Sequence, residues 1–252
     1  LLAGCAPQSA TVSAWGKIVT LVQAEQAGAP ALWASSEQVT AAWVGADEAH
    51  LFQAARTVID GQLSPIMTLP LARAYPHAQQ LFPASNGNLH LLWLDADVDG
   101  EMRLFAALLS PQLELRRGPT PVSDQRVFRY AAISGGDGAL WVVYSGGLVA
   151  EPALFVGYVD AEGRARQDGR RLVTDADWPS LAQAADGATW LLWRQPSDGQ
   201  VQRARFTAST LDTAQATAAL PLNTGDRLES VQVAFDQTHG YLFWNITRAN
   251  GQ

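Results

Sequence analysis

The chain has 252 residues, of which 48% are hydrophobic and 9% aromatic. This apolar content suffices for a packed core and excludes a mainly disordered chain. The net charge is −7, with 17 Lys and Arg residues scattered among 24 Asp and Glu, so we expect no nucleic-acid binding. Cys5 is the only cysteine, which excludes an intrachain disulfide and a metal site built from several cysteines.

The N-terminal residues predict a lipid anchor. The sequence Leu1-Leu2-Ala3-Gly4-Cys5 places small residues directly before the cysteine. It resembles the lipobox of bacterial lipoproteins, in which an export signal is cut before the cysteine and the thiol is lipidated. Residues 6–14 are small and polar, as expected of a flexible tether. The resemblance implies lipidation of Cys5 and attachment to a membrane, on the extracytoplasmic side of the bacterial cell envelope.

A turn followed by an apolar strand that ends on an aromatic residue recurs five times along the chain. The clearest copy runs from the turn Asp186-Gly187 to Trp193, and the terminal aromatics follow one another at intervals of 50, 51, 49 and 51 residues. A fixed period in this range indicates a structural repeat. The five aromatics are Trp43, Trp93, Tyr144, Trp193 and Trp244, and we expect the tryptophans among them to pack between neighbouring sheets.

Each repeat predicts four antiparallel strands joined by hairpins. In the fourth repeat we expect strands at 179–184, 189–194, 201–206 and near 216–222, because Asp-Gly turns separate alternating or apolar runs. Four such strands in about 50 residues are the blade of a β-propeller. A β-sandwich of similar modules is the alternative, but it offers no reason for such even spacing.

We therefore expect an all-β fold, a β-propeller of four-stranded antiparallel blades over residues 15–252, preceded by the lipobox remnant and tether at 1–14. Residues 16–23 alternate like a strand, and such a strand is suited to closing the last blade. Because the fifth blade holds only two expected strands, we expect the chain to be a fragment. The expected blades are four full ones, at 27–72, 73–122, 126–174 and 177–222, and a partial fifth at 227–252.

The Asp-Gly hairpin that leads to a tryptophan resembles the blades of sialidase-type (BNR-repeat) propellers, across roughly 27–246. In that family an Asp-box, Ser-x-Asp-x-Gly-x-x-Trp, lies between the third and fourth strands. Here that place holds Ser209-Thr210-Leu211-Asp212-Thr213 and, in the third blade, Asp160-Ala161-Glu162-Gly163. The Gly and Trp are not in register, so the Asp-boxes are degenerate. The resemblance implies the propeller architecture and carries over no catalytic residue.

In a propeller, the loops between the fourth strand of one blade and the first strand of the next open on the face that surrounds the central channel. Polar residues on that face are the natural candidates for ligand binding. Trp178 precedes the first strand of the fourth blade, where its ring is suited to stacking a sugar. The predicted ligand-binding residues are Asp124, Asp175, Trp178 and Asp226.

The same loops hold the candidates for catalysis. A glycosidase needs two carboxyl groups, or a carboxyl group and a tyrosine, on either side of a sugar. A sialidase also needs several arginines, whose planar guanidinium groups bind the substrate carboxylate through paired hydrogen bonds. The alternative is that these residues are polar because loops are solvated. The candidates are Asp177, Glu229, Arg126, Arg129, Arg194 and Arg227.

One acidic segment has the spacing of a calcium loop. Asp95, Asp97 and Asp99 precede Gly100, so alternate side chains can converge on one hard cation. The position of the bidentate glutamate holds Ala106 instead. The alternative is an acidic hairpin, and we expect no other cofactor.

These observations favour a lipid-anchored binding or recognition module whose ligand is a glycan or a protein. Two alternatives stay open. The first is a sialidase-like glycoside hydrolase, and the second is a structural component of an envelope complex, which predicts a contiguous exposed apolar patch on a blade. A propeller supports all three functions, so the fold alone does not decide between them.

Overall fold

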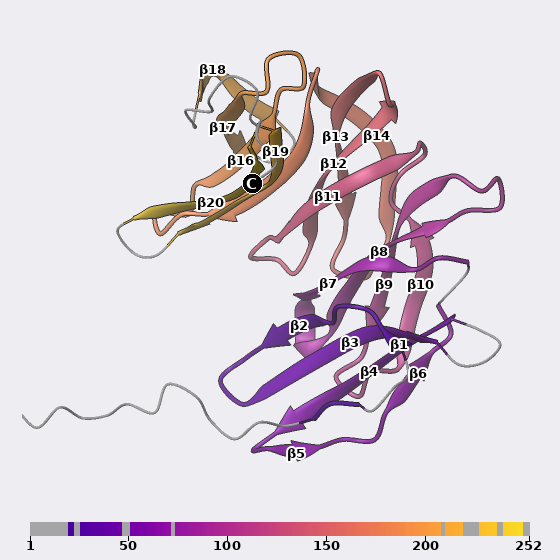
Figure 1. The fold of residues 1–252 in the computed structure, drawn as a ribbon. Coiled ribbons are helices and arrows are strands. Elements are labelled where there is room, and N and C mark those ends of the chain that lie inside the picture. Colours follow the sequence, from indigo (N-terminus) through magenta and orange to yellow (C-terminus); the bar gives the residue numbers. More distant parts are fainter. Residues whose placement is uncertain are drawn as a thin grey trace, which may run out of the picture.

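The computed structural model describes residues 20–22, 26–46, 51–71, 74–207, 210–218, 227–235 and 239–248. The described chain is almost entirely β-strand, and its sheets follow one another around an arc from the N-terminal to the C-terminal part (Figure 1). Within this part of the chain, no helix is long and apolar enough to cross a membrane. The predicted all-β propeller architecture is confirmed.

Four of the five sheets contain at least four antiparallel strands. In the second, third and fourth sheets the strands pair in chain order, so every connection within these sheets is a hairpin. The first sheet also contains two short strands, β1 (Gln26–Ala27) beside β3 and β5 (Gln62–Leu63) beside β4. Its main strands are β2 (Ala31–Ala34), β3 (Gln38–Ala46), β4 (Leu51–Ile59) and β6 (Met67–Leu69).

The next three sheets have four strands each. The second sheet comprises β7 (His77–Pro83), β8 (Leu89–Ala96), β9 (Met102–Leu109) and β10 (Leu115–Pro121). The third comprises β11 (Val127–Ser134), β12 (Leu140–Leu148), β13 (Glu151–Val159) and β14 (Ala165–Thr174). The fourth comprises β15 (Asp177–Gln183), β16 (Thr189–Arg194), β17 (Val201–Thr207) and β18 (Thr210–Ala218). The fifth sheet contains β19 (Arg227–Phe235) and β20 (Gly240–Thr247).

The turn between the first two strands of a sheet has a local cause. In the fourth sheet, Gly187 has φ 80°, a backbone conformation that glycine adopts without steric cost. The Asp186 carboxylate accepts a hydrogen bond of 2.9 Å from the backbone N–H of Ala188, which is the Asx turn that aspartate forms readily. The third sheet repeats this bond between Asp137 and Ala139, at 3.1 Å. The sequence motif therefore folds its hairpin locally.

Most of the core lies between neighbouring sheets. Trp93 and Trp193 are at most 4% exposed and pack there, as expected. Trp43 is equally buried but packs on the first sheet alone, against Phe52. Trp93 stacks on Phe105 at 5.8 Å between ring centroids, in a cluster that joins the first and second sheets. Trp244 differs from the expectation, because 47% of it is exposed on β20.

The segment expected to close the last blade is described only in part. Of the strand expected at 16–23, the structure describes only residues 20–22, and these form no strand. Leu21 and Val22 pack against Trp43 of the first sheet, and the Leu21 carbonyl accepts a 2.7 Å hydrogen bond from the Arg56 guanidinium. This described part covers the first sheet instead of extending the fifth.

A β-bulge recurs near the start of the first strand in the second, third, fourth and fifth sheets. In the second sheet it lies between His77 and Gln80, and in the fourth between Asp177 and Ser180. A bulge breaks the regular alternation and turns a side chain in a new direction. Each of these bulges lies near the start of the innermost strand of its sheet.

Candidate functional site

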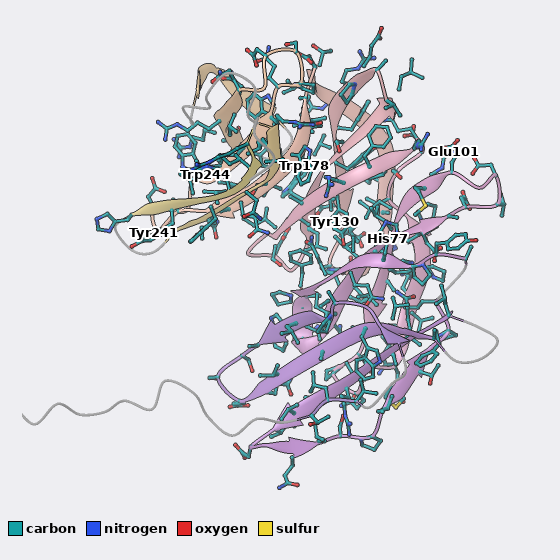
Figure 2. The ribbon with its side chains drawn as sticks, viewed as in Figure 1. His77, Glu101, Tyr130, Trp178, Tyr241 and Trp244 are labelled. Atoms are coloured by element: carbon teal, nitrogen blue, oxygen red, sulfur yellow. The ribbon has the colours of Figure 1, made fainter. Side chains whose placement is uncertain are left out.

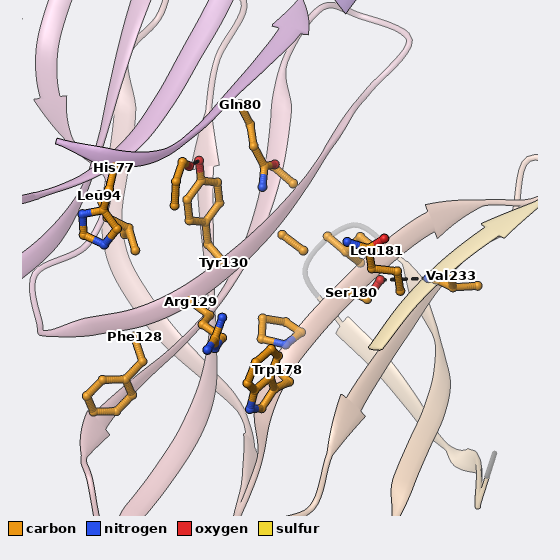
Figure 3. Close-up of a pocket in the computed structure, with 15 residues that line it drawn as sticks. His77, Gln80, Leu94, Phe128, Arg129, Tyr130, Trp178, Ser180, Leu181 and Val233 are labelled. Atoms are coloured by element: carbon orange, nitrogen blue, oxygen red, sulfur yellow. Dashed lines mark hydrogen bonds between the residues drawn. The ribbon is translucent and has the colours of Figure 1, made fainter. Parts of the chain in front are cut away.

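A cavity of ≈ 720 Å³ lies between the first strands of the second, third, fourth and fifth sheets. This volume is within the ~300–1,000 Å³ typical of small-molecule sites. Figure 3 shows its wall, to which the bulged entries of β7, β11 and β15 contribute. Its polar and aromatic lining residues include His77, Gln80, Phe128, Arg129, Tyr130, Trp178, Ser180 and Gln232.

Trp178 is held at the edge of this cavity in an unusual backbone conformation. Its φ is 52°, which a bulky residue rarely adopts. The Arg129 guanidinium carbon lies 3.3 Å from the centre of the indole ring, and that of Arg194 lies 5.9 Å away. A guanidinium over an indole face is a favourable cation–π contact. Trp178 and Arg129 therefore form one platform, which we call the Trp178 platform.

Asp177 and Arg194 bind each other beside this platform. The guanidinium donates to both carboxylate oxygens, at 2.8 and 2.5 Å, and also to the Leu228 carbonyl of the fifth sheet at 3.2 Å. Both side chains are mostly buried, with exposures of 16% for Asp177 and 20% for Arg194. Two of the six catalytic candidates are thus joined in a bidentate ion pair, which also links the fourth sheet to the fifth.

Tyr130 lines the cavity but directs its hydroxyl into the protein. The hydroxyl donates to the Ala78 carbonyl and also lies 3.1 Å from the Leu92 carbonyl. Burial raises the pKa of Tyr130 well above its usual value of 10.0. Since the phenol stays protonated, Tyr130 holds the β7 bulge in place and supplies no acid or base to the cavity.

Arg126, another predicted catalytic residue, lies away from the Trp178 platform. Arg126 lies 3.5 Å from Glu101 and stacks on Phe128 at 5.3 Å. Figure 2 shows Glu101 at the outer margin, whereas His77, Tyr130 and Trp178 lie in the middle of the array. Arg227 and Glu229 belong to β19, but their side chains are outside the described part of the chain.

Of the predicted ligand-binding residues that the structure describes, only Trp178 lines the cavity. Asp175 accepts a 3.2 Å hydrogen bond from the backbone N–H of Ser197, so it joins the loop before β15 to the turn after β16. Asp124 is exposed, and its carbonyl accepts a 2.6 Å hydrogen bond from Arg103. Asp226 and the predicted lipidation site Cys5 lie outside the described residues.

Two aspartates of the acidic segment bind different partners. Asp95 is fully buried and accepts hydrogen bonds from the backbone of Ala74 at 3.1 Å and Tyr75 at 2.8 Å. Asp99 binds Arg103 at 2.7 Å. Within the described residues, no group of three or more His, Cys, Asp or Glu is arranged to hold a metal ion. The calcium site at Asp95, Asp97 and Asp99 therefore stays a prediction.

Sequence reasoning missed the residues that line the cavity from within the first strands. Gln80, Tyr130 and Ser180 are 50 residues apart in sequence and occupy equivalent positions after the bulge. The repeat period was a signal that could have found them. No aspartate or glutamate is among the described residues that line the cavity, so its described wall offers aromatic, amide, hydroxyl and guanidinium groups.

Comparisons with known proteins support the architecture. No protein family and no curated protein matches the sequence. A solved thermostable family-43 glycoside hydrolase is similar over 93% of this chain and 89% of its own, with a TM-score of 0.54 and 10% identity. A protein of unknown function from Dyadobacter fermentans DSM 18053 is similar over 91% of this chain and 75% of its own, with a TM-score of 0.60 and 9% identity.

At such low identity the similarity shows the fold alone. It agrees with the propeller that the sequence repeat predicted. The resemblance to sialidase-type blades therefore holds at the level of the architecture, and the comparisons add no sequence support for BNR repeats or for the lipobox.

Proposed function

We propose that this propeller recognises a glycan in its central cavity and does not hydrolyse it. The observation that carries the proposal is the Trp178 platform, an indole fixed by Arg129 at 3.3 Å on the wall of a ≈ 720 Å³ cavity. Sugar rings combine an apolar C–H face with hydroxyl edges, which suit an aromatic surface flanked by planar polar groups. Gln80 and Gln232 supply such groups on the same wall.

The state of the carboxylates supports binding over catalysis. Glycoside hydrolysis requires two carboxyl groups about 5–10 Å apart that face the sugar. Asp177 is bound to Arg194 through both oxygens, and the described lining of the cavity contains no carboxylate. The similarity to a glycoside hydrolase supports a glycan as the class of ligand. With the lipid anchor predicted at Cys5, the propeller would present this site on the extracytoplasmic side of the cell envelope.

The experiment measures binding and hydrolysis together. Purified protein is applied to an array of plant and bacterial cell-wall oligosaccharides, and the oligosaccharides that bind are then incubated with it and assayed for released reducing sugar. We expect binding without release, and weaker binding for Arg129→Ala but not for Arg126→Ala. Release of reducing sugar would favour the glycoside hydrolase, release of sialic acid from sialyllactose the sialidase-like enzyme, and the absence of any bound glycan would refute the proposal.

A structural role in an envelope complex is the second candidate, and one observation favours it. Tyr241, Phe243 and Trp244 on β20 are 46%, 58% and 47% exposed, so both faces of this strand carry exposed aromatic side chains. Exposed apolar patches often mark sites of protein association. Replacing Phe243 and Trp244 with serine should abolish association in sedimentation experiments if this role holds, and leave glycan binding unchanged.

A further inference from the structure

A second cleft lies beside the central cavity, on the side of the first sheet. Its volume is ≈ 410 Å³, and it lies between β3 and the start of β7. His77 and Ala78 line both the central cavity and this cleft, so the start of β7 borders both spaces. A ligand that fills both spaces must pass over the β7 bulge.

The cleft combines apolar and polar surfaces. Pro30, Leu51 and Pro76 supply apolar surface, while His77 supplies a planar polar group and Gln79 lies in the wall with its amide buried. Such a combination suits a sugar unit, whose C–H groups pack on apolar side chains while its hydroxyls form hydrogen bonds. The chemistry of this cleft therefore resembles that of the central cavity, without an aromatic platform.

Gln79 is the residue of the cleft that most needs a partner. It is only 9% exposed, and neither end of its side-chain amide has a hydrogen-bond partner among the described residues. Native proteins rarely leave a buried amide unpaired, because its desolvation is not compensated. Such a group calls for an explanation, and a ligand that completes its hydrogen bonds is one.

The repeat shows that this position serves the cavity in another sheet. The residue 50 positions after Gln79 is Arg129, which lines the central cavity and stacks on Trp178. The next equivalent is Pro179, which has no polar group to offer. Two of these three equivalent positions therefore hold a side chain that forms hydrogen bonds. Gln79 lies beside the cleft, and Arg129 lies beside the central cavity.

We propose that the cleft is a subsite for an outer unit of a linear oligosaccharide whose inner unit rests on the Trp178 platform. Rotation of the Gln79 side chain turns its amide, which lies beneath the cleft wall, toward the hydroxyls of that outer unit. The inference rests on the proposed function and narrows the ligand from glycans in general to chains that reach from Trp178 past Ala78. A monosaccharide or a disaccharide would leave the cleft empty.

Calorimetry with oligosaccharides of increasing length tests this subsite. The probes are xylan- and glucan-derived series from the monosaccharide to the hexasaccharide, measured against the wild type and Gln79→Leu. We expect the wild-type affinity to rise until the chain fills the cleft and then to level off. Gln79→Leu should lose about tenfold in affinity for the long chains, because an amide–hydroxyl contact is lost, and bind the shortest binding chain like the wild type.

Chemical denaturation separates a binding role from a structural one. Gln79→Leu removes an unpaired amide at nearly constant volume, so its unfolding midpoint should equal or exceed that of the wild type. Gln112→Leu, in the exposed turn before β10, serves as a control that should change neither length dependence nor affinity. A lowered midpoint for Gln79→Leu, with length dependence intact, would show that Gln79 is structural.

The remaining outcomes distinguish the two proposals. If the wild type binds short and long chains equally well, or if Gln79→Leu keeps the wild-type preference for long chains, the subsite is overturned while glycan recognition stands. If the wild type binds no saccharide of any length, the proposed function fails and the subsite fails with it.

Discussion

The second and fourth sheets begin with the same backbone and use it differently. Ala78 and Trp178 stand two repeats apart, each in the bulge of a first strand, and each with φ 52°. A left-handed backbone costs a bulky residue about 1 kcal/mol or more. The bulge recurs in both sheets, but only in the fourth does it hold a bulky side chain, Trp178, for which this backbone conformation is unfavourable. A role of the indole in ligand binding would explain why it is kept there.

The two bulges are held by neighbouring residues of one strand. Arg129 of β11 stacks on Trp178, and Tyr130 of β11 donates to the Ala78 carbonyl. Adjacent residues of a strand point to opposite sides, so β11 supports the fourth sheet with one residue and the second sheet with the next. The two bulges therefore differ in the group that β11 contacts. It is the Trp178 indole in the fourth sheet and the Ala78 carbonyl in the second.

The largest expected effect is on ligand binding through Trp178. Trp178→Ala should lower glycan affinity by about 50-fold, because a central aromatic in a binding site contributes roughly 2 kcal/mol or more. Calorimetry with a glycan selected by the array measures this loss. Trp178→Phe should recover part of it. A Trp178→Ala variant within twofold of the wild type would show that the indole is kept for packing.

The next effect concerns how the second sheet's bulge is held. Tyr130→Phe leaves the Ala78 carbonyl and the buried Leu92 carbonyl without their hydroxyl donor, so we expect a loss of about 2 kcal/mol in the free energy of unfolding. Equilibrium unfolding in urea measures it. Tyr75→Phe is the matched control, since Tyr75 is 68% exposed and should tolerate the change. Equal stability of the two variants would contradict the role assigned to Tyr130.

The third prediction concerns the first residue of β15, which differs from the first residue of β7. Asp177 pairs with Arg194 across β15 and β16, whereas the equivalent residues of the second sheet are His77 and Leu94. Asp177→Asn should lower the free energy of unfolding by about 1 kcal/mol, allowing for the partial exposure of the pair. Asp99→Asn, in a more exposed pair with Arg103, should cost less. A larger loss for Asp99→Asn in urea unfolding would refute this ranking.

The architecture could be predicted because short sequence motifs that recur in every repeat determine its strands and turns. The Asp-Gly turn folds its own hairpin, and a period near 50 residues follows from the size of four short strands. The bulges could not be predicted in this way. The bulged positions hold Ala78, Phe128 and Trp178. None of these is a glycine or asparagine, the residue types that signal unusual backbone conformations, so the bulge is imposed by the surrounding sheets.

The site was predicted in pieces and not as a whole. Trp178 was expected to bind a ligand, and Arg129 to belong to a catalytic group, but their stacking depends on how neighbouring sheets are inclined. The pairing of Asp177 with Arg194 could have been predicted from the sequence. Counting back from the Asp-Gly turn, where Gln183 faces Thr189, places the two residues opposite each other once one bulge is allowed. The contact between Arg129 and Trp178 could not be predicted, because it depends on how two sheets are inclined to each other.

The last comparison places His90 of the second sheet against Trp190 of the fourth, which occupies the equivalent position. His90 is fully buried, and its Nε2 lies 2.9 Å from the Gly138 carbonyl, to which it donates. Desolvation by burial lowers the pKa of His90 below its usual value of 6.5, although the hydrogen bond to Gly138 and the charge of Asp160 oppose this. The folded protein therefore keeps this imidazole neutral.

The sign of the pH effect follows from that shift. Because the unfolded chain takes up a proton at His90 more readily than the folded chain, stability that is fully present above pH 6.5 is lost as the pH falls below that value. His90→Gln keeps a donor for the Gly138 carbonyl but does not titrate. Urea unfolding between neutral and mildly acidic pH should thus show a shallower decline for His90→Gln than for the wild type. Identical slopes would mean that other groups, and not this buried imidazole, set the acid sensitivity of the second sheet.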